Sequence, residues 1–271
     1  MHLTQVVHAL RIRTRLRSLI AKSKSHLAEA IARRRFSDDL YVRDGFLLLL
    51  DRASVVDRSV IEQGDWEPHL RERLFAHADR YFGDKDQIFI DVGSYFGLYA
   101  IHASRRPGFS SIYAFEADPL NFAQLQANLF LNRLAHRVTA RNLFIDAASG
   151  FTKMTRSSAM SDNRGGAGRY PDTANQQTVP CAALDDVLDL TDRRLVVKVD
   201  VENAELEAIK GMRKLLTSNR IVLQVESGWP EEMISACRDM GLRYLGSLHD
   251  HYFTSEEDTS ESVPRGLLRT S

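Results

Sequence analysis

Short apolar runs alternate along most of the chain with longer segments whose apolar positions lie three or four residues apart. The first pattern is typical of strands buried on both faces, and the second is typical of helices that cover them. Core strands are predicted at 87–91, 111–116, 138–145, 195–200 and 221–226, and helices near 96–105, 119–132, 203–216 and 230–240. This alternation requires right-handed crossovers and predicts a doubly wound α/β fold with a mostly parallel sheet.

The segments that flank this core carry other patterns. Residues 40–63 alternate short apolar runs with polar breaks, which predicts a strand-rich cover built as an antiparallel hairpin. A helix is predicted to begin near Pro68 and to end at Gly83. Its apolar face comprises Leu70, Leu74, Phe75, Ala78 and Phe82. Segments 243–246 and 251–254 are predicted to pair as a terminal antiparallel hairpin.

A length of 271 residues allows one large α/β domain and an appendage. We expect residues 1–63 to form a basic N-terminal helix followed by the strand-rich cover. Residues 64–255 are expected to form the ligand-binding domain, and residues 256–271 a loose tail.

Charge is unevenly spread although the net charge is zero. Residues 1–35 hold nine Lys or Arg and a single acid, Glu29, whereas the remainder holds 27 Lys or Arg and 35 acids. The basic segment suits a solvated helical or disordered arm, an arm on an anionic membrane surface or a partner subunit, or an organelle transit peptide. The acidic body argues against a nucleic-acid substrate.

Two observations bear on the cellular compartment. Cys181 and Cys237 lack the spacing of a metal site and suit buried packing under reducing conditions. The longest apolar runs fall far short of the roughly 20 residues that a membrane span needs. These features predict a cytoplasmic protein.

The stretch around Gly93 and Gly97 is the first with candidate chemistry. A buried strand ending in Asp91 leads into a glycine turn and then a helix, the arrangement that opens nucleotide-binding α/β folds. Its D-x-G-x-x-x-G pattern lacks the third glycine of the dinucleotide fingerprint, and Asp91 would repel a pyrophosphate. S-adenosylmethionine (SAM) carries an ammonium and a sulfonium and no phosphate, and therefore suits this acid. The alternative is a plain turn after a buried strand.

Glu116 ends the next apolar run, nineteen residues beyond Gly97. An acid at about that distance from the glycine turn reaches the ribose of a bound nucleoside and accepts from both of its hydroxyls. The alternative role, capping the helix at Pro119, is filled by Asp118.

Together these residues resemble the FkbM-type methyltransferase family. The resemblance extends from about Trp66 to Glu226 and rests on Phe89–Gly97, "AFEADP" at 114–119, "NLFLN" at 128–132 and "VKVDVENAELEAIKG" at 197–211. It implies a seven-stranded, Rossmann-like methyltransferase sheet, SAM as the cofactor, and methylation of hydroxyls on small molecules, sugars or glycans.

The chain departs from the family pattern K-x-D-x-E-G-x-E at Asn203, which stands where the family has glycine. Asn tolerates positive φ better than other side chains, so the turn is expected to survive. The alternative is that Asn203 projects into the pocket and changes the acceptor site. Trp66 and Glu67 match a family position before the cofactor strand and are expected either to border the pocket or to pack the helix start.

The cofactor-binding assignments follow from the strand ends, where ligands of open α/β sheets bind. Asp91 and the Gly93–Gly97 turn are assigned to the methionine end, and the backbone N–H groups of Ser94 and Tyr95 to its carboxylate. The ribose is assigned to Glu116. Asp146 is assigned to the adenine amino group, with Phe115 or Ala117 as ring walls and a plain turn as the alternative.

Asp200 and Glu202 follow the fourth strand, beside the expected methyl group. Either is a candidate general base for an alcohol acceptor, or a ligand for a divalent ion that would lower the acceptor pKa. Glu226 adds a third acid, yet no metal is predicted. The polar, glycine-rich segment 155–178 is expected to be a lid, a binding loop or disordered, with Arg156, Arg164, Arg169 and Tyr170 as candidate acceptor contacts.

Two other functions stay open on the sequence alone. An NAD-linked oxidoreductase would use the same fold, although Asp91 and the missing glycine count against it. A non-catalytic binding module would use the basic arm, and Asn203 is the one local feature that suits it. The sequence distinguishes neither the acceptor, nor O- from N-methylation, nor the oligomeric state.

Overall fold

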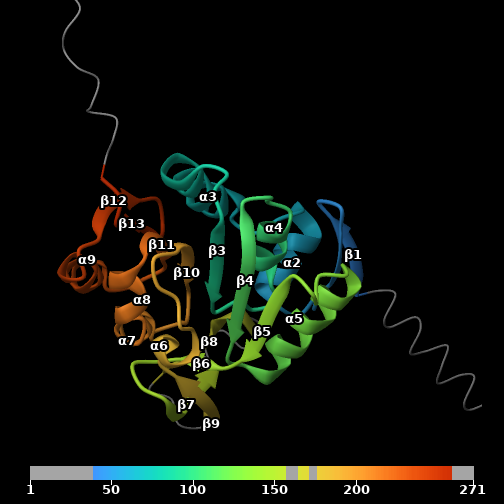
Figure 1. Cartoon of the computed structure of the whole chain (residues 1–271). Coiled ribbons are helices and arrows are strands. Elements are labelled where there is room, and N and C mark those ends of the chain that lie inside the picture. The colour runs from blue at the N-terminus through green and yellow to red at the C-terminus, as the bar shows by residue number, and fades with distance from the viewer. Residues whose placement is uncertain (1–38, 157–163, 171–175, 258–271) are drawn as a thin grey trace, which may run out of the picture.

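The computed structural model describes residues 39–156, 164–170 and 176–257 (Figure 1). The N-terminal basic helix predicted at 1–36 and all but two residues of the predicted tail 256–271 lie outside these ranges.

A seven-stranded mixed sheet forms the centre of the fold, in the order β12-β13-β11-β10-β3-β4-β5 (Figure 1). The strands are β3 (Gln87–Val92), β4 (Phe109–Glu116), β5 (Val138–Asn142), β10 (Arg194–Val199), β11 (Arg220–Val225), β12 (Arg243–Ser247) and β13 (His251–Thr254). The five strands from β5 to β11 are parallel, and β13 pairs antiparallel with both β11 and β12. The α/β class and the terminal hairpin are therefore as predicted from the sequence.

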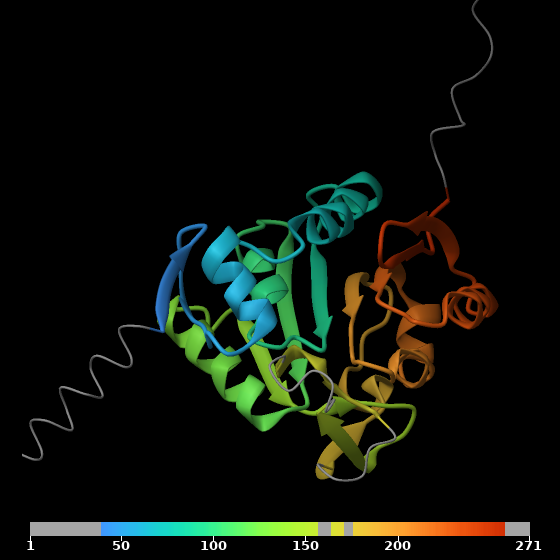
Figure 2. The same cartoon turned by 180° about the vertical axis from the view of Figure 1, so that it is seen from behind.

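Helices cover both faces of this sheet, as continuous apolar strands require (Figures 1 and 2). Phe89 of β3 packs into one core with α3 (Pro68–Phe82), α4 (Leu98–Ser104) and α5 (Pro119–Leu131). Its neighbours Ile88 and Ile90 point to the other face because side chains alternate along a strand. There they pack with α6 (Leu184–Val187), α7 (Glu205–Lys210), α8 (Arg213–Ser218) and α9 (Pro230–Asp239).

Helices α3 and α5 begin as their sequences predict. Both have proline in the first turn, and all five apolar positions predicted for α3 are buried. The Asp118 side chain caps α5 by accepting from the backbone N–H groups of Leu120 and Asn121. Capping by Asp118 leaves Glu116 available for another role.

The "NLFLN" segment at 128–132 holds the N-terminal hairpin in place. Residues four apart lie on one face of a helix, and Asn128 and Asn132 of α5 use that face to bind β2 (Phe46–Leu49). Their side-chain oxygens accept from Leu49 N–H at 2.6 Å and Leu47 N–H at 2.9 Å. The hairpin partner is β1 (Leu40–Arg43).

The strand-rich cover predicted at 40–63 is only half strand. The hairpin β1–β2 is present, but Val55–Gln63 forms helix α2. Val56 and Val60 are four residues apart and both face the core, which is helical spacing. Gly64 ends the helix at φ +94°. The prediction of further strand here is wrong because a short pair of apolar residues fits both the two-residue period of a strand and the 3.6-residue period of a helix.

The helix predicted at 203–216 is interrupted at Gly211. The chain passes so close to β6 (Phe144–Ile145) that a Cβ on Gly211 would lie 1.9 Å from the Asp146 carbonyl oxygen. The second half, α8, is capped from a distance by Asp185, whose carboxylate accepts from the N–H groups of Lys214 and Leu215. Such a tertiary cap has no local sequence signal.

A second, four-stranded sheet in the order β6-β9-β7-β8 replaces part of the predicted strand 138–145 and of the predicted loop 155–178. Its other strands are β7 (Gly150–Arg156), β8 (Ala167–Gly168) and β9 (Gln176–Ala182). The turn that separates β5 from β6 is fixed by the N–H of Leu143, which donates to the Glu116 carbonyl at 3.0 Å. This sheet lies beside the ends of β4, β5 and β10 (Figure 1).

Two further expectations concern the described residues. Cys181 and Cys237 are free and buried, as predicted. Among the helices of the described ranges, none combines the length and apolar character that crossing a bilayer requires.

Candidate functional site

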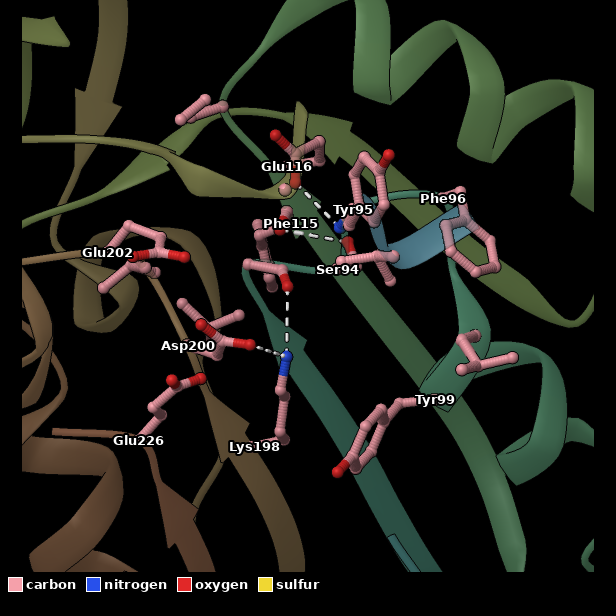
Figure 3. A pocket seen from close by; sticks show the side chains of 18 of the residues that line it. Ser94, Tyr95, Phe96, Tyr99, Phe115, Glu116, Lys198, Asp200, Glu202 and Glu226 are labelled. Carbon is pink, nitrogen blue, oxygen red and sulfur yellow. Dashed lines mark hydrogen bonds and ion pairs between the residues drawn. The ribbon is translucent and has the colours of Figure 1, made fainter. Parts of the chain in front are cut away.

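A cavity of about 350 Å³ lies at the carboxyl ends of the central strands (Figure 3). This edge is where ligands of open α/β sheets bind, and the volume lies within the range of small-molecule sites. Residues from several strand ends, helices and loops form its wall. The lining residues used below are Trp66, Glu67, Gly93, Ser94, Tyr95, Phe115, Glu116, Ala117, Leu143, Phe144, Ile145, Gly165, Ala167, Lys198, Asp200, Glu202, Glu226, His249 and Asp250.

Gly93 brings the ends of β3 and β10 into direct contact. Its φ is +82°, and a Cβ at this position would lie 1.6 Å from the Asp200 carbonyl oxygen. Only glycine fits such an approach. Gly97, also at positive φ, begins α4 against Leu125 and lies outside the cavity wall.

The substitution Gly93→Ala is expected to lower the free energy of unfolding by at least about 3 kcal/mol, because strained φ adds to a backbone clash. Gly241→Ala is the matched control, since Gly241 has φ +81° with open space around it. We expect that control to lose only about 1–2 kcal/mol. Urea denaturation measures both, and equal losses would show that the contact with Asp200 carries no weight.

The N–H groups of Ser94 and Tyr95 are already paired within the protein. Ser94 donates through N–H and hydroxyl to the Phe115 carbonyl, both at 3.0 Å, and Tyr95 N–H donates to Glu116 Oε2 at 2.8 Å (Figure 3). The two residues line the cavity, but the structure uses these donors internally and not for a ligand carboxylate. A ligand carboxylate would need other donors.

Glu116 ends β4 with its carboxylate in the cavity wall. Oε2 accepts from Tyr95 N–H and Oε1 from Asp118 N–H, each at 2.8 Å. The Asn121 side chain also hydrogen-bonds to this carboxylate, whose two oxygens have four lone pairs between them, so acceptor capacity is left for a ligand. The residue is only 6% exposed, and burial raises the pKa of the Glu116 carboxyl to about 7. Donors on a ligand would favour the ionised form.

Asp91 lies behind the cavity wall and does not line it. It is fully buried, and its Oδ2 accepts from Ala100 N–H of α4 at 3.2 Å. Burial raises the pKa of the Asp91 carboxyl to about 6, against the opposing effect of Lys198. The structure therefore places Asp91 beneath the turn that it was expected to serve.

Lys198 joins the two sides of the site. Its Nζ lies 2.8 Å from Asp200 Oδ2 and 3.3 Å from the Gly93 carbonyl oxygen (Figure 3). Burial alone would lower the pKa of Lys198, but the carboxylates of Asp200 and Asp91 raise it above its usual range. This role of Lys198 was not predicted from the sequence, although a single lysine within the apolar run of β10 is a visible signal.

Three acidic side chains lie near one another at the carboxyl ends of β10 and β11, namely Asp200, Glu202 and Glu226 (Figure 3). The strands are paired in parallel, and Glu226 N–H donates to the Val199 carbonyl at 3.0 Å, which sets Glu226 beside Asp200. The negative charge of Asp200 and burial together raise the pKa of Glu226 well above its usual range. Burial and then Asp200 raise the pKa of Glu202 to about 7, while the Tyr170 hydroxyl donates to Glu202 Oε2 at 3.0 Å.

The raised pKa of Glu202 predicts a pH-dependent stability. From its ordinary value of 4.5 to about 7, the folded state binds more protons at this carboxyl than the unfolded state. The contribution of the Glu202 carboxyl to folding stability is fully present below pH 4.5 and is lost as the pH rises through about 7. We expect the unfolding free energy of Glu202→Gln to fall less steeply than that of the wild type across pH 5–8, in urea titrations. Parallel curves would contradict the raised pKa.

The turn at Glu202 and Asn203 has positive φ at both residues, +52° and +67°. Asn203 therefore adopts the backbone conformation for which the family pattern has glycine, and its N–H donates to Glu205 Oε1 at 3.0 Å. Gly168 of β8 packs against this turn, where a Cβ would lie 2.1 Å from the Glu202 carbonyl oxygen. The second sheet is thereby fixed to the acidic edge of the cavity.

The remaining predicted residues divide between the cavity and its surroundings. Ala117 lines the cavity, next to an apolar wall of Leu143, Phe144 and Ile145. Asp146, the predicted adenine contact, lies outside the lining, and its carboxylate accepts from Arg169 and from Ala147 N–H.

The described part of the predicted loop 155–178 contributes to the cavity cover. Gly165 and Ala167 line the cavity. Arg164 is paired with Asp51 at 3.0 Å, so its guanidinium is engaged within the protein. The side chain of Arg156 lies outside the described part of the chain.

The cavity wall also includes residues with no firm assignment from the sequence. Trp66 packs against the core of the α3–α5 face and lines the cavity as well, which unites the two expectations for it. Glu67, His249 and Asp250 complete the acidic side. Within the described ranges, no group of three or more His, Cys, Asp or Glu side chains is arranged to hold a metal ion.

Comparison with known proteins places this α/β chain among the methyltransferases. The model of the methyltransferase FkbM domain matches residues 91–253, more than half of the sequence. The chain therefore belongs to the FkbM methyltransferase family, as the sequence resemblance predicted.

Individual relatives are more distant. The hexuronic acid methyltransferase AglP of Haloferax volcanii is 27% identical over 148 residues, which cover 54% of this chain and 58% of that protein. The chain thus matches little more than half the length of this curated relative. The crystal structure of methyltransferase FkbM from Methylobacillus flagellatus has a TM-score of 0.44 and 17% identity, covering 68% of this chain and 50% of that one. The AdoMet complex of TYW2 from M. jannaschii has a TM-score of 0.39 and 13% identity, covering 79% of this chain and 82% of that one.

Proposed function

We propose that the chain binds SAM in the 350 Å³ cavity and transfers its methyl group to a hydroxyl of a small molecule, sugar or glycan. The observation that carries the proposal is the position of Glu116. Its buried carboxylate faces the cavity one strand away from the Gly93 turn, with acceptor capacity left for a ligand. Membership of the FkbM methyltransferase family supports the same activity.

The residues present fit the parts of this cofactor. Glu116 would accept from the two ribose hydroxyls. The apolar wall of Phe115, Ala117 and Leu143–Ile145 would hold the adenine ring. Acids on the opposite wall, with Asp200 nearest to the Gly93 turn, would favour the ammonium and the sulfonium. Gly93 lines the cavity without a side chain, and the Asp200 backbone occupies the place of its Cβ.

When bound, SAM supplies a methyl group on a sulfonium, which is already a good leaving group. The protein's tasks are to align the acceptor hydroxyl and to remove its proton. Glu202 suits the second task, because a general base works best when its pKa lies near the operating pH, and the pKa of Glu202 is about 7. Asp200 is held by Lys198, so this carboxylate is fixed in position beside the base.

The acceptor class is inferred from the curated relative and from the charge of the cavity. AglP is by its name a hexuronic acid methyltransferase, and this supports a carbohydrate acceptor here. The acid-lined half of the cavity supports a neutral acceptor in preference to an anionic one, because its carboxyl groups would repel a carboxylate whenever they are ionised.

Titration calorimetry with SAM and with NAD tests the binding step, and mass spectrometry of a hydroxyl-acceptor panel tests transfer. We expect SAM to bind with a dissociation constant in the micromolar range or below and NAD to bind at least about a hundredfold more weakly, since the acid-lined wall opposes a pyrophosphate. Equal affinities would favour an NAD-linked enzyme instead. Tight SAM binding with no transfer to any acceptor would favour a non-catalytic module.

A further inference from the structure

A second cavity of about 190 Å³ lies directly beside the first, between α7 and α9. It is lined by Asn203, Ala204, Glu205, Leu206, Glu207, Ser227, Trp229, Glu232 and Met233. The two cavities are lined by consecutive residues of two segments. Glu202 and Glu226 line the first, and the residues that follow them, Asn203 and Ser227, line the second. A ligand that extends out of the first cavity along these segments would enter the second.

Trp229 presents an exposed aromatic surface on a fixed backbone. Its side chain is 66% exposed, whereas Trp66 is partly buried against the core. The Trp229 N–H donates to Ser227 Oγ at 3.1 Å, and its carbonyl accepts from Met233 N–H at 3.1 Å as α9 begins. Exposing the apolar surface of an indole to water is unfavourable. A flat apolar face of a ligand that stacks on the indole would remove this surface from water.

The polar residues around Trp229 favour a neutral ligand with hydroxyl groups. Glu205 is buried and accepts from Asn203 N–H, and Glu207 is paired with Lys210 at 2.6 Å. Glu232 is exposed on α9 and adds a carboxylate acceptor. No Lys or Arg is among the described residues that line this cavity, so an anionic ligand would meet carboxylates without a cation to neutralise it.

We propose that this second cavity binds a neutral sugar unit of the acceptor, next to the unit that is methylated. One face of a pyranose ring, made of C–H groups, would stack on the Trp229 indole. The ring hydroxyls would donate to Glu232 and exchange hydrogen bonds with the Asn203 amide. The acceptor is then a neutral oligosaccharide or glycoside of at least two units. This assignment of the acceptor rests on the proposed methyltransferase function of the first cavity.

Asn203 has a specific part in this subsite. Glycine at this position would keep the positive φ of +67° without strain, but would remove the amide from the lining. The substitution Asn203→Gly therefore tests the side chain without disturbing the turn.

The two tryptophans of the chain make a direct test practical, since each lines a different cavity. In Trp66→Phe, Trp229 is the sole tryptophan, and its emission is followed while neutral disaccharides to tetrasaccharides of glucose, mannose and N-acetylglucosamine are added. Their monosaccharides and uronate-containing counterparts are titrated in parallel. We expect at least one neutral oligosaccharide to shift the emission, with affinity at least about tenfold higher than for its monosaccharide or uronate counterpart, since both ring stacking and charge contribute.

Asn203→Gly and Glu232→Gln, each in the Trp66→Phe background, are expected to weaken that oligosaccharide about fivefold or more, in line with the loss of a hydrogen-bond partner. Glu231→Gln is the matched control, since Glu231 is exposed on the same helix and lines neither cavity. The subsite is overturned if no neutral oligosaccharide shifts the emission, or if uronate-containing sugars bind as tightly as neutral ones.

The reciprocal protein, Trp229→Phe, separates this proposal from the function on which it rests. Trp66 then reports on the first cavity alone, and its emission is expected to change on addition of SAM. A response to SAM at Trp66 without any response to sugars at Trp229 would overturn the subsite and leave the methyltransferase proposal standing. Absence of the SAM response would overturn the methyltransferase proposal itself.

Discussion

Replacing Glu116 with alanine is expected to weaken SAM binding by at least about a hundredfold. The variant removes two charge-assisted hydrogen bonds to the ribose, each contributing about 1.5–3 kcal/mol, and every 1.4 kcal/mol corresponds to about tenfold in affinity. Titration calorimetry at pH 8 is the appropriate measurement. The carboxyl, whose pKa burial raises to about 7, is then mostly ionised even without ligand.

The same substitution also leaves the N–H groups of Tyr95 and Asp118 without their acceptor. We therefore expect Glu116→Ala to lose about 1–3 kcal/mol of stability as well, and thermal unfolding must confirm that it is folded at the titration temperature. Glu62→Ala on α2 is the control, because Glu62 is exposed and lies outside the cavity wall. The assignment of Glu116 to the ribose would be contradicted if the folded Glu116→Ala variant kept a SAM affinity within about threefold of wild type. A threefold change corresponds to about 0.7 kcal/mol, which is less than even one such hydrogen bond contributes.

Replacing Glu202 with glutamine is expected to lower kcat by about 10²–10⁴, the usual contribution of a general base. Glutamine keeps the size of the side chain and cannot take the proton of the acceptor hydroxyl. SAM affinity should stay within about threefold, because the ribose and adenine contacts lie on the other wall and Asp200, the acid nearest to the Gly93 turn, is retained. Glu231→Gln, exposed on α9 outside the cavities, is the matched control and should keep its turnover.

The pH profile adds a second readout for the same residue. In the wild type, kcat/KM is expected to rise as the pH passes through about 7, where the Glu202 carboxyl loses its proton. The residual activity of Glu202→Gln should lack that rise. Full turnover in Glu202→Gln would exclude Glu202 as the base and leave Asp200, beside Lys198, as the candidate.

Much of the fold was predictable because its signals are local. The continuous apolar runs of β3, β10 and β11, the glycine turn at Gly93 and the cap at Asp118 all depend on residues close together in sequence. Glu116 was predicted to lie at the same edge as Gly93 because parallel neighbouring strands end on the same side of a sheet. The structure places both in one cavity wall.

The surroundings of the other predicted site residues depend on side-chain direction or on distant partners. Strand β3 continues through Val92, and Asp91 points toward α4 instead of the cavity because side chains alternate along a strand. Asp146 is drawn away by Arg169, twenty-three residues later in the chain. The internal pairing of the Ser94 and Tyr95 N–H groups depends on the end of β4 and likewise has no local sequence signal.

The second sheet, β6-β9-β7-β8, could not be predicted from hydrophobic periodicity. Strand β8 has two residues, and β9 begins with three polar residues and contains Pro180, so neither gives a clear strand signal. Their positions are set by contacts such as Gly168 against Glu202, which exist only in the folded chain. The division into residues 1–63, 64–255 and 256–271 stays a prediction.

The central claim is that Glu116 binds the ribose of SAM within the cavity formed by the tips of β3, β4 and β10. A crystal structure of the protein with S-adenosylhomocysteine tests it most directly. The account predicts both ribose hydroxyls within hydrogen-bonding distance of the Glu116 carboxylate, with the adenine against Leu143–Ile145. A ligand bound elsewhere, or a ribose out of reach of Glu116, would contradict it.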